Sequence, residues 1–313
     1  MITWRARTWR VFKLGLGQFV RNRLAVLGIA IIVVYGIAGF VYPFLLGTVW
    51  PSGVYNPVTG FDPNVIPHPA PPGDGHFFGT DSLGRDVLSQ LLAATRPTWI
   101  MAMVAAFSTA AVATVVGATG ALFRGWIDAV FSRLSDAFLL LPAPIFMLVI
   151  GSSERSQDIG PVDFGLIYGV ITGVGAGAIV IRAQALKVIA SPFIDAARVA
   201  GAGRWRILGL HVMPHLYPLA AVYMMLAVVG AIVADGFAAW LGQTGTRVNW
   251  GTLVYNGITF TDPITGLVAW NVIIPPSIAL SLFAAAFYLV SVGLREVADP
   301  RYRAARRRTF DPV

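Results

Sequence analysis

Six long apolar stretches divide the sequence, and polar segments separate them. The stretches occupy residues 24–46, 99–122, 134–151, 162–181, 216–240 and 275–294. The hydrocarbon layer of a membrane takes about 20 apolar residues as an α-helix, so each stretch is long enough to cross it. The first is also longer than the apolar core of a signal peptide, which predicts an uncleaved anchor. The pattern therefore predicts an all-α, polytopic membrane protein with six transmembrane helices.

Basic residues gather in the polar segments on one side of this arrangement. Nineteen of the 23 Lys and Arg residues fall in 1–23, 123–133, 182–215 and 295–313, and the segments that alternate with these hold four. Short loops rich in Lys and Arg stay in the cytoplasm. We therefore expect both termini and the 182–215 loop to be cytoplasmic. The basic tail is then a flank of the last helix, and no nucleic-acid partner is expected.

The N-terminal segment 1–23 alternates Trp and other apolar residues with Arg and Lys. This alternation is consistent with a short amphipathic helix on the inner surface of the membrane. Such a helix would place its apolar side against membrane lipid. A frayed tail is the alternative interpretation.

The polar segment 47–98 is long and rich in Pro. Seven Pro residues between positions 51 and 72 forbid a regular helix and favour extended structure over the outer face. Further along, Thr80, Asp81 or Ser82 can cap a helix. The apolar face of that helix would contain Leu83, Val87, Leu88, Leu91 and Leu92. The aspartates here lack the spacing of a Ca²⁺ loop, so capping and an ion pair with Arg85 explain them more simply.

Composition agrees with a chain embedded in a bilayer. Of 313 residues, 56% are hydrophobic and 12% are charged, whereas soluble domains contain about 25% charged residues. Mean hydropathy is +0.71. Cysteine is absent, which excludes disulfides, thiolate metal ligands and cysteine nucleophiles.

The sequence offers no catalytic or energy-coupling site of its own. It has no G-x-x-x-x-G-K-[ST] phosphate-binding loop, and no Ser/His/Asp or paired-carboxylate arrangement stands out. Gly169, Gly173 and Gly177 repeat every four residues inside an apolar stretch, which predicts close helix packing. His211 and His215 have no carboxylate shortly after them, so we expect loop histidines rather than metal ligands. We expect no catalytic residue, no metal site and no cofactor on this chain.

The cytoplasmic segment 182–215 is too long for a simple turn. Small residues at 196, 197 and 200–203 predict a short helix followed by a tight bend. A surface helix faced with Ala and Gly allows another protein to approach closely, which favours a docking role. A plain interhelical loop is the alternative.

This segment also resembles the cytoplasmic signature E-A-A-x₃-G-x₉-I-x-L-P of ABC-importer permeases, with its spacing fully kept. Asp195 stands in place of Glu, and His211 and Met213 replace Ile and Leu. In that family the loop forms a coupling helix that sits in a groove of an ATPase subunit. The residues that the resemblance assigns to the ATPase-coupling loop are Asp195, Ala196, Ala197, Arg198, Gly201, Arg204 and Pro214.

Further landmarks are similar to the oligopeptide/dipeptide/nickel branch of these permeases, and to its second permease subunit. They include residues 21–28, the Trp250-Gly251 pair and the closing Asp299-Pro300-Arg301. The third-span landmarks are Trp126, Asp128, Arg133, Asp136 and Pro142. The external motif G-T-D-x-x-G-R-D corresponds to Gly79, Thr80, Asp81, Gly84, Arg85 and Asp86. The segments after the fifth stretch and near the end of the sixth depart from the family pattern, which leaves the substrate open.

The resemblance implies the type I ABC-importer permease fold, in the cell membrane of a prokaryote. A homologous second permease would supply the other half of the pore, two cytoplasmic ATPase subunits would drive import, and an external binding protein would deliver the substrate. That substrate would be a peptide, or alternatively an oligosaccharide or a nickel complex. The chain would divide into the cytoplasmic segment 1–23, the first transmembrane helix 24–46, the external segment 47–98, the five-helix core 99–294 with its coupling loop 182–215, and the tail 295–313.

A self-sufficient secondary transporter or channel is the alternative from a different class. Such a protein would use acidic residues within the membrane and often inverted repeats, and no internal repeat is evident here. Asp235 lies deep in the fifth stretch and is the candidate pore or substrate residue. It would either contact a cationic group of the substrate or pair with a polar group on the facing permease.

Overall fold

The computed structural model describes residues 19–73, 75–151, 159–240, 248–259 and 269–298, together with Gly17. Within these ranges the regular structure is helical, and β pairing is limited to two isolated bridges. Residues 1–16 and 299–313 lie outside the described residues, so the amphipathic helix expected near the N-terminus stays a prediction.

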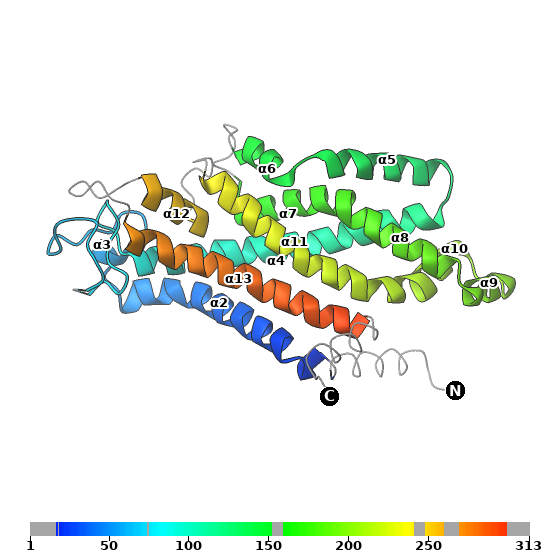
Figure 1. Ribbon diagram of the computed structural model, residues 1–313, viewed down its shortest axis with the longest axis horizontal. Coiled ribbons are helices and arrows are strands. Elements are labelled where there is room, and N and C mark those ends of the chain that lie inside the picture. Colours follow the sequence, from blue (N-terminus) through cyan, green and yellow to red (C-terminus); the bar gives the residue numbers. More distant parts are fainter. Residues whose placement is uncertain are drawn as a thin grey trace, which may run out of the picture.

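The helices form one elongated bundle (Figure 1). In chain order they are α2 (Arg23–Thr48), α3 (Ser52–Tyr55), α4 (Val87–Leu122), α5 (Trp126–Leu140), α6 (Ala143–Gly151), α7 (Pro161–Thr172), α8 (Ala178–Ile189), α9 (Pro192–Val199), α10 (Arg204–Ile207), α11 (Met213–Trp240), α12 (Trp250–Thr259) and α13 (Trp270–Ala298). Two π-helical turns, Gly173–Gly177 and Leu208–Val212, join α7 to α8 and α10 to α11.

Five described helices are long and apolar enough to cross a membrane, and α5 with α6 makes a sixth if the bent pair is one span. The prediction of an all-α, polytopic membrane protein is therefore confirmed, with five spans or, if the bent pair is one span, the expected six. The third span is not the single straight helix expected over 134–151, because α5 and α6 meet at 78°. The break falls at Leu141, which adopts extended backbone angles. Pro142 explains this, since a residue before proline disfavours the α conformation.

α4 is the central helix and packs against α2, α7, α8 and α11. It begins at Val87, whereas the second span was expected to begin at residue 99, so the external helix and the second span are one element. Pro97 lies inside α4 without ending it, as membrane helices tolerate. The buried side of α4 is rich in Ala and Gly, which lets four neighbouring helices approach it closely.

The packing role predicted for the glycine repeat is confirmed. A Cβ atom at Gly173 would lie 2.9 Å from Cβ of Val112, and one at Gly177 would lie 2.7 Å from Cβ of Ala113. Both neighbours are on α4. Gly169 faces Ser108 on the same helix in the same way. Any larger side chain at these positions would force the two spans apart.

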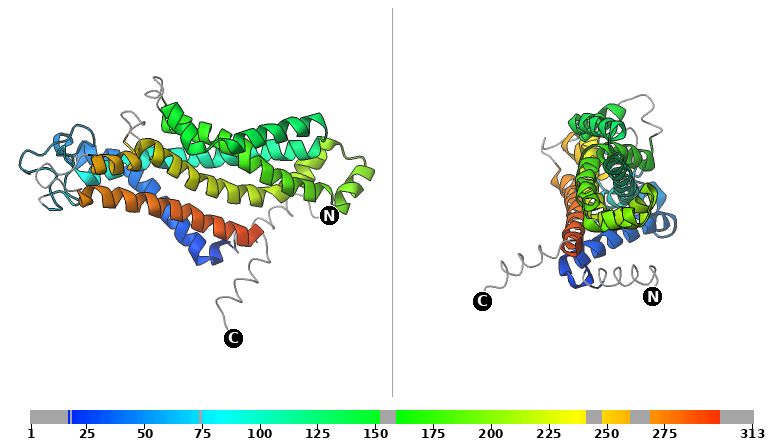
Figure 2. Two further views of the ribbon diagram at one scale, coloured as in Figure 1. Left: turned by 45° about the horizontal axis from the view of Figure 1, so that its top comes forward. Right: turned by 90° about the vertical axis from the view of Figure 1, so that its right-hand side faces the viewer.

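α9 and the last described residues of α13 lie toward the end of the bundle at which α2 begins (Figures 1 and 2). α3, α12 and the segment that precedes α4 lie toward the opposite end (Figure 1). α2 thus begins, and α13 ends, toward the same end of the bundle. This is the arrangement expected of a chain with an even number of spans, such as six. Which end faces the cytoplasm stays a prediction from the distribution of basic residues.

The segment 182–215 is more helical than predicted. α8 continues to Ile189, and the chain becomes helical again at Arg204 in a span that runs through α11. His211 and His215 therefore lie within helix, and their assignment to a loop was wrong. Pro214 lacks the N–H of a helical hydrogen bond. The π-helical turn directly before it instead carries the helix through.

Candidate functional site

α9 and the bend after it project from one end of the bundle (Figure 1). Pro192 occupies the first turn of α9, where its missing N–H costs nothing, and Ile194 is the buried side chain of this helix. Val199, on the outward side, is 91% exposed. Asp195 and Arg198 pair at 3.0 Å in the open, where an ion pair contributes about 0–1 kcal/mol. α9 is thus anchored mainly by Ile194 and presents much of its remaining surface.

The bend after α9 confirms the predicted short helix and tight turn. Gly201 has φ of +83°, in the left-handed region that favours glycine, and its N–H donates to the carbonyl of Arg198 at 2.9 Å. No atom lies within 4 Å of a Cβ built at Gly201 or Gly203. Ala196 is exposed and Ala197 is half-buried. A partner protein could therefore approach this backbone closely.

A cleft of about 590 Å³ lies between α9, α10 and the turn that joins α4 to α5. Its charged lining residues are Arg124, Asp195, Arg198 and Arg204. Pro214 does not line the cleft, because it lies ten residues beyond Arg204, about 15 Å further along the helix. The structure thus brings the first residues of the coupling signature together and leaves its final proline in α11.

The external motif folds into a turn that directly precedes α4. Gly79 and Gly84 have φ of +75° and +78°. A Cβ at Gly79 would lie 2.8 Å from Nδ2 of Asn271, and one at Gly84 would lie 2.5 Å from the ring of Phe61. Both positions require glycine, for backbone conformation and for space.

Thr80 and Asp81 are buried inside this turn. Oγ1 of Thr80 accepts the N–H of Ala70 at 2.9 Å. Asp81 pairs with Arg85 at 2.6 Å, which confirms the predicted ion pair, and accepts from Nε2 of Gln90 at 3.0 Å. The motif residues therefore hold the turn together from within.

The residue that caps α4 differs from the prediction. Asp86 accepts the N–H of Ser89 at 2.6 Å, whereas the sequence pointed to residues 80–82. The Asp81 carboxylate is occupied by donors within the turn, so the helix starts only after the turn closes. Leu83, expected on the apolar face of the helix, lies in the turn and is exposed.

A buried histidine joins the motif to the Pro-rich segment. Nδ1 of His76 lies 2.8 Å from Oδ2 of Asp86, and Nε2 lies 3.4 Å from Oδ2 of Asp62. Burial raises the pKa of Asp86 above its ordinary value, although hydrogen bonds from Ser89 and His76 oppose this. The N–H of Asn64 is the main cause that lowers the pKa of Asp62.

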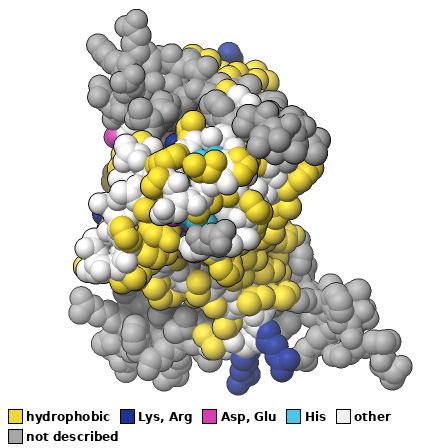
Figure 3. Space-filling view, turned by 90° about the vertical axis from the view of Figure 1, so that its left-hand side faces the viewer, with side chains coloured by type: hydrophobic (Ala, Val, Ile, Leu, Met, Phe, Trp, Pro, Cys, Tyr) yellow, Lys and Arg dark blue, Asp and Glu magenta, His cyan; other side chains and the backbone are white. Residues whose placement is uncertain are grey.

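Figure 3 views the molecule from this end. Hydrophobic side chains with uncharged atoms between them cover most of the described part of this face. Because the carboxylates of this motif are buried, the motif supports this end of the bundle rather than forming a charged surface on it.

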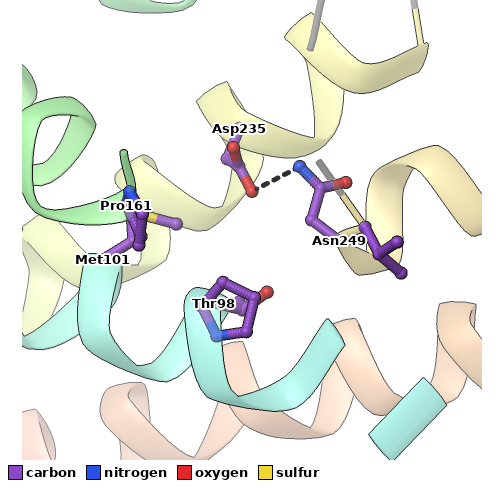
Figure 4. Close-up of a pocket in the computed structure, with 7 residues that line it drawn as sticks. Thr98, Met101, Pro161, Asp235 and Asn249 are labelled. Carbon is purple, nitrogen blue, oxygen red and sulfur yellow. Dashed lines mark hydrogen bonds between the residues drawn. The ribbon is translucent and has the colours of Figure 1, made fainter. Parts of the chain in front are cut away.

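Asp235 lies in α11 beside a small pocket, where α11 approaches α4, the start of α7 and the start of α12 (Figure 4). It is 7% exposed, and its Oδ2 accepts a hydrogen bond from Nδ2 of Asn249 at 3.1 Å. Thr98, Met101 and Pro161 also line the pocket. The carboxylate thus faces the interior of the bundle, as the cost of a charge in lipid requires.

Two residues near the site were not identified from the sequence. Asn249 accepts the N–H of Thr252 at 2.7 Å, and an Asn directly before a helix is a cap signal that could have found it. Arg182 donates from Nε and Nη2 to the carboxylate of Asp128, at 2.6 Å in both cases. No local signal links these two residues, which are 54 positions apart.

Fold and site together define a polytopic α-helical membrane protein with a small, exposed helix projecting from one end. In the described ranges no group of three or more His, Asp or Glu side chains could hold a metal ion. Residues 111–304 match the family of binding-protein-dependent transport system inner membrane components, and the chain belongs to this family. It is a multi-pass inner-membrane permease subunit of a binding-protein-dependent ABC importer.

Relatives match along most of their length. The oligopeptide transport system permease protein OppC of Mycobacterium tuberculosis is 28% identical over 292 residues, 93% of this chain and 94% of its own. OppC of Haemophilus influenzae is 29% identical over 292 residues, 91% of this chain and 87% of its own. A peptide transport system permease of Brucella suis is 31% identical over 237 residues, 74% and 76% of the two chains. The resemblance noted in the sequence is thereby confirmed.

Proposed function

We propose that this chain forms half of a peptide-translocation pathway, together with a homologous second permease. Two cytoplasmic ATPase subunits supply the energy, and an external binding protein delivers the substrate. In this proposal the chain itself catalyses no reaction and holds no cofactor. Three relatives named for peptide or oligopeptide transport support a peptide over an oligosaccharide or a nickel complex.

The observation that carries the proposal is the exposed surface of α9. A helix of eight residues that buries only Ile194 gains little from packing on its own bundle. Its exposed Ala196 and the open bend at Gly201 provide the close backbone approach that a docking partner needs. An ATPase subunit that binds α9 and moves it would also move α8 and α10, which flank α9 in the chain. The movement of α10 would in turn reach the long helix α11.

Adding bulk at Ala196 tests this docking surface. Ala196→Trp should leave the folded permease intact, because the side chain points into open space, and should abolish co-purification of the ATPase subunits and peptide uptake. A tight protein interface tolerates extra volume poorly, at a cost of about 1–3 kcal/mol. Gly201→Trp would be a poorer test, since a Trp at φ of +83° strains the bend itself.

Ala30→Trp is the matched control, because Ala30 is exposed on α2, on the apolar surface of the first span. It should retain both the ATPase subunits and uptake. If Ala196→Trp also retains ATPase association and normal uptake, α9 is not the docking helix and the proposed coupling route is wrong.

A further inference from the structure

α5 carries a row of polar side chains that its own bundle covers only in part. Of its 15 residues only Ser135 is fully buried. Asp128, Ser132 and Asp136 follow one another at intervals of four and therefore lie along one side of the helix. We call these three residues the α5 polar row. Leu134 lies two positions from two of them, on the opposite side of α5, and is 44% exposed.

The polar row runs inward from the end of the bundle that carries α9. α5 begins at Trp126, two residues after Arg124, which lines the cleft beside α9. Asp136 is ten residues further along, which corresponds to about 15 Å of helix. A hydrocarbon layer is about 30 Å thick, so Asp136 lies well inside it if α5 crosses steeply. The short side chain of Asp cannot reach back to the surface as a long Arg or Lys side chain does.

Within the described residues Asp136 has no hydrogen-bond or ion-pair partner. Arg182 interacts electrostatically with Asp136 but gives its hydrogen bonds to Asp128. Asp136 is exposed, and Ser132 is half-buried. An ionised side chain turned toward lipid costs about 2.5–3.5 kcal/mol on insertion scales, so lipid is an unfavourable neighbour for this side of α5.

The opposite side of α5 has the composition that lipid favours. Val130 and Leu134 are both apolar and exposed there. α5 therefore separates two environments along its length, an apolar one beside these residues and an aqueous one beside the polar row. A soluble solute that crosses the membrane through this permease needs an aqueous face of this kind.

We propose that the α5 polar row lines the inner part of the translocation pathway and is in contact with water there. This inference rests on the proposed function and deepens it, because it names which side of α5 faces the moving solute. Arg182 fixes Asp128, the row residue closest to the end of the bundle that carries α9. Asp136 presents its carboxylate to the pathway.

Thiol accessibility tests this assignment in the assembled importer. Because this chain contains no cysteine, Ser132→Cys, Asp136→Cys and Leu134→Cys each introduce a single reactive group. The complex is reconstituted in lipid vesicles and treated with a charged methanethiosulfonate, and the mass of this chain reports the labelling. Ser132→Cys is nearly isosteric, so its labelling does not depend on a disturbed fold.

Ser132→Cys and Asp136→Cys should react at least about tenfold faster than Leu134→Cys, because a charged reagent is excluded from hydrocarbon. Equal rates at Asp136→Cys and Leu134→Cys would overturn the inference. So would protection of both row positions until detergent is added, which is the result expected if the second permease covers the row.

Peptide uptake by the same vesicles separates this inference from the function on which it rests. A complex that imports peptides while both row positions stay protected contradicts only the assignment of the row. A complex of the unsubstituted chain that retains its ATPase subunits but imports no peptide contradicts the proposed substrate, whatever the labelling pattern.

Discussion

Arg182 and Asp128 form a bidentate ion pair that joins α8 to the first turn of α5. Both hydrogen bonds are 2.6 Å long, and the two side chains are 33% and 21% exposed. The planar guanidinium matches both oxygens of the carboxylate, which a lysine ammonium cannot do. α5 packs mainly against the π-helical turn Gly173–Gly177 and α4, and this pair adds a polar link to the span that leads directly into α9.

Arg182→Lys and Asp128→Asn should each destabilise the permease, and a double-mutant cycle should give a coupling energy of about 1–2 kcal/mol, between the values for exposed and buried pairs. The apparent Tm of the purified complex measures this. Arg198→Lys and Asp195→Asn form the matched control, because that pair is 50% and 65% exposed and should couple weakly. Equal coupling in the two cycles would show that the Arg182 pair does not brace α5.

Periodic features of this fold are visible in the sequence, because they depend on residues close together in the chain. Hydropathy locates the six spans, and the repeat of Gly169, Gly173 and Gly177 locates a packing face. The short helix and bend at α9 follow from local small residues and from Gly201 in the same way. Each of these features is decided by one helix or one turn.

Features that depend on distant segments could not be predicted in this way. Asp81 and Asp86 have the same capping ability, and only the folded turn, which consumes the Asp81 carboxylate, decides that Asp86 caps α4. The partner of Asp235 is Asn249, supplied by the segment before α12. The pairing of Arg182 with Asp128 likewise requires α5 and α8 to be placed side by side first.

The external turn should depend strongly on Gly79. Gly79→Ala should lower the apparent Tm of the permease, because the left-handed backbone costs a residue with a Cβ about 1–2 kcal/mol and the new atom also meets Asn271. Gly53→Ala in α3 is the matched control. A Cβ at Gly53 meets nothing within 4 Å, and no unusual φ is required there, so stability should not fall. Similar Tm values for the two variants would contradict a specific role of Gly79.

Topology can be read from single cysteines in this cysteine-free chain. An impermeant thiol reagent added to intact cells should label Ile66→Cys, which is 75% exposed in the external segment, and should spare Gly203→Cys in the bend after α9. Inside-out vesicles should give the reverse pattern, since the basic segments are expected in the cytoplasm. Labelling of Gly203→Cys in intact cells would invert the assignment.

Asp235 and Asn249 should act first as a structural pair that joins α11 to the start of α12. Asp235→Ala removes the acceptor of the buried Asn249 amide, and an unsatisfied buried donor costs about 1–3 kcal/mol, so the apparent Tm should fall. Asp235→Asn keeps the shape and an acceptor oxygen but removes the charge. It should retain most of the stability and should import neutral and cationic peptides in the same ratio as the unsubstituted permease. A selective loss of cationic-peptide import by an intact Asp235→Asn complex would instead show that the carboxylate recognises the substrate.

Asn249→Ala separates the two roles of Asp235 further, because it removes the hydrogen-bond donor of this pair while leaving the charge of Asp235. It should lower stability as Asp235→Ala does if the pair is structural, and should leave the peptide preference unchanged.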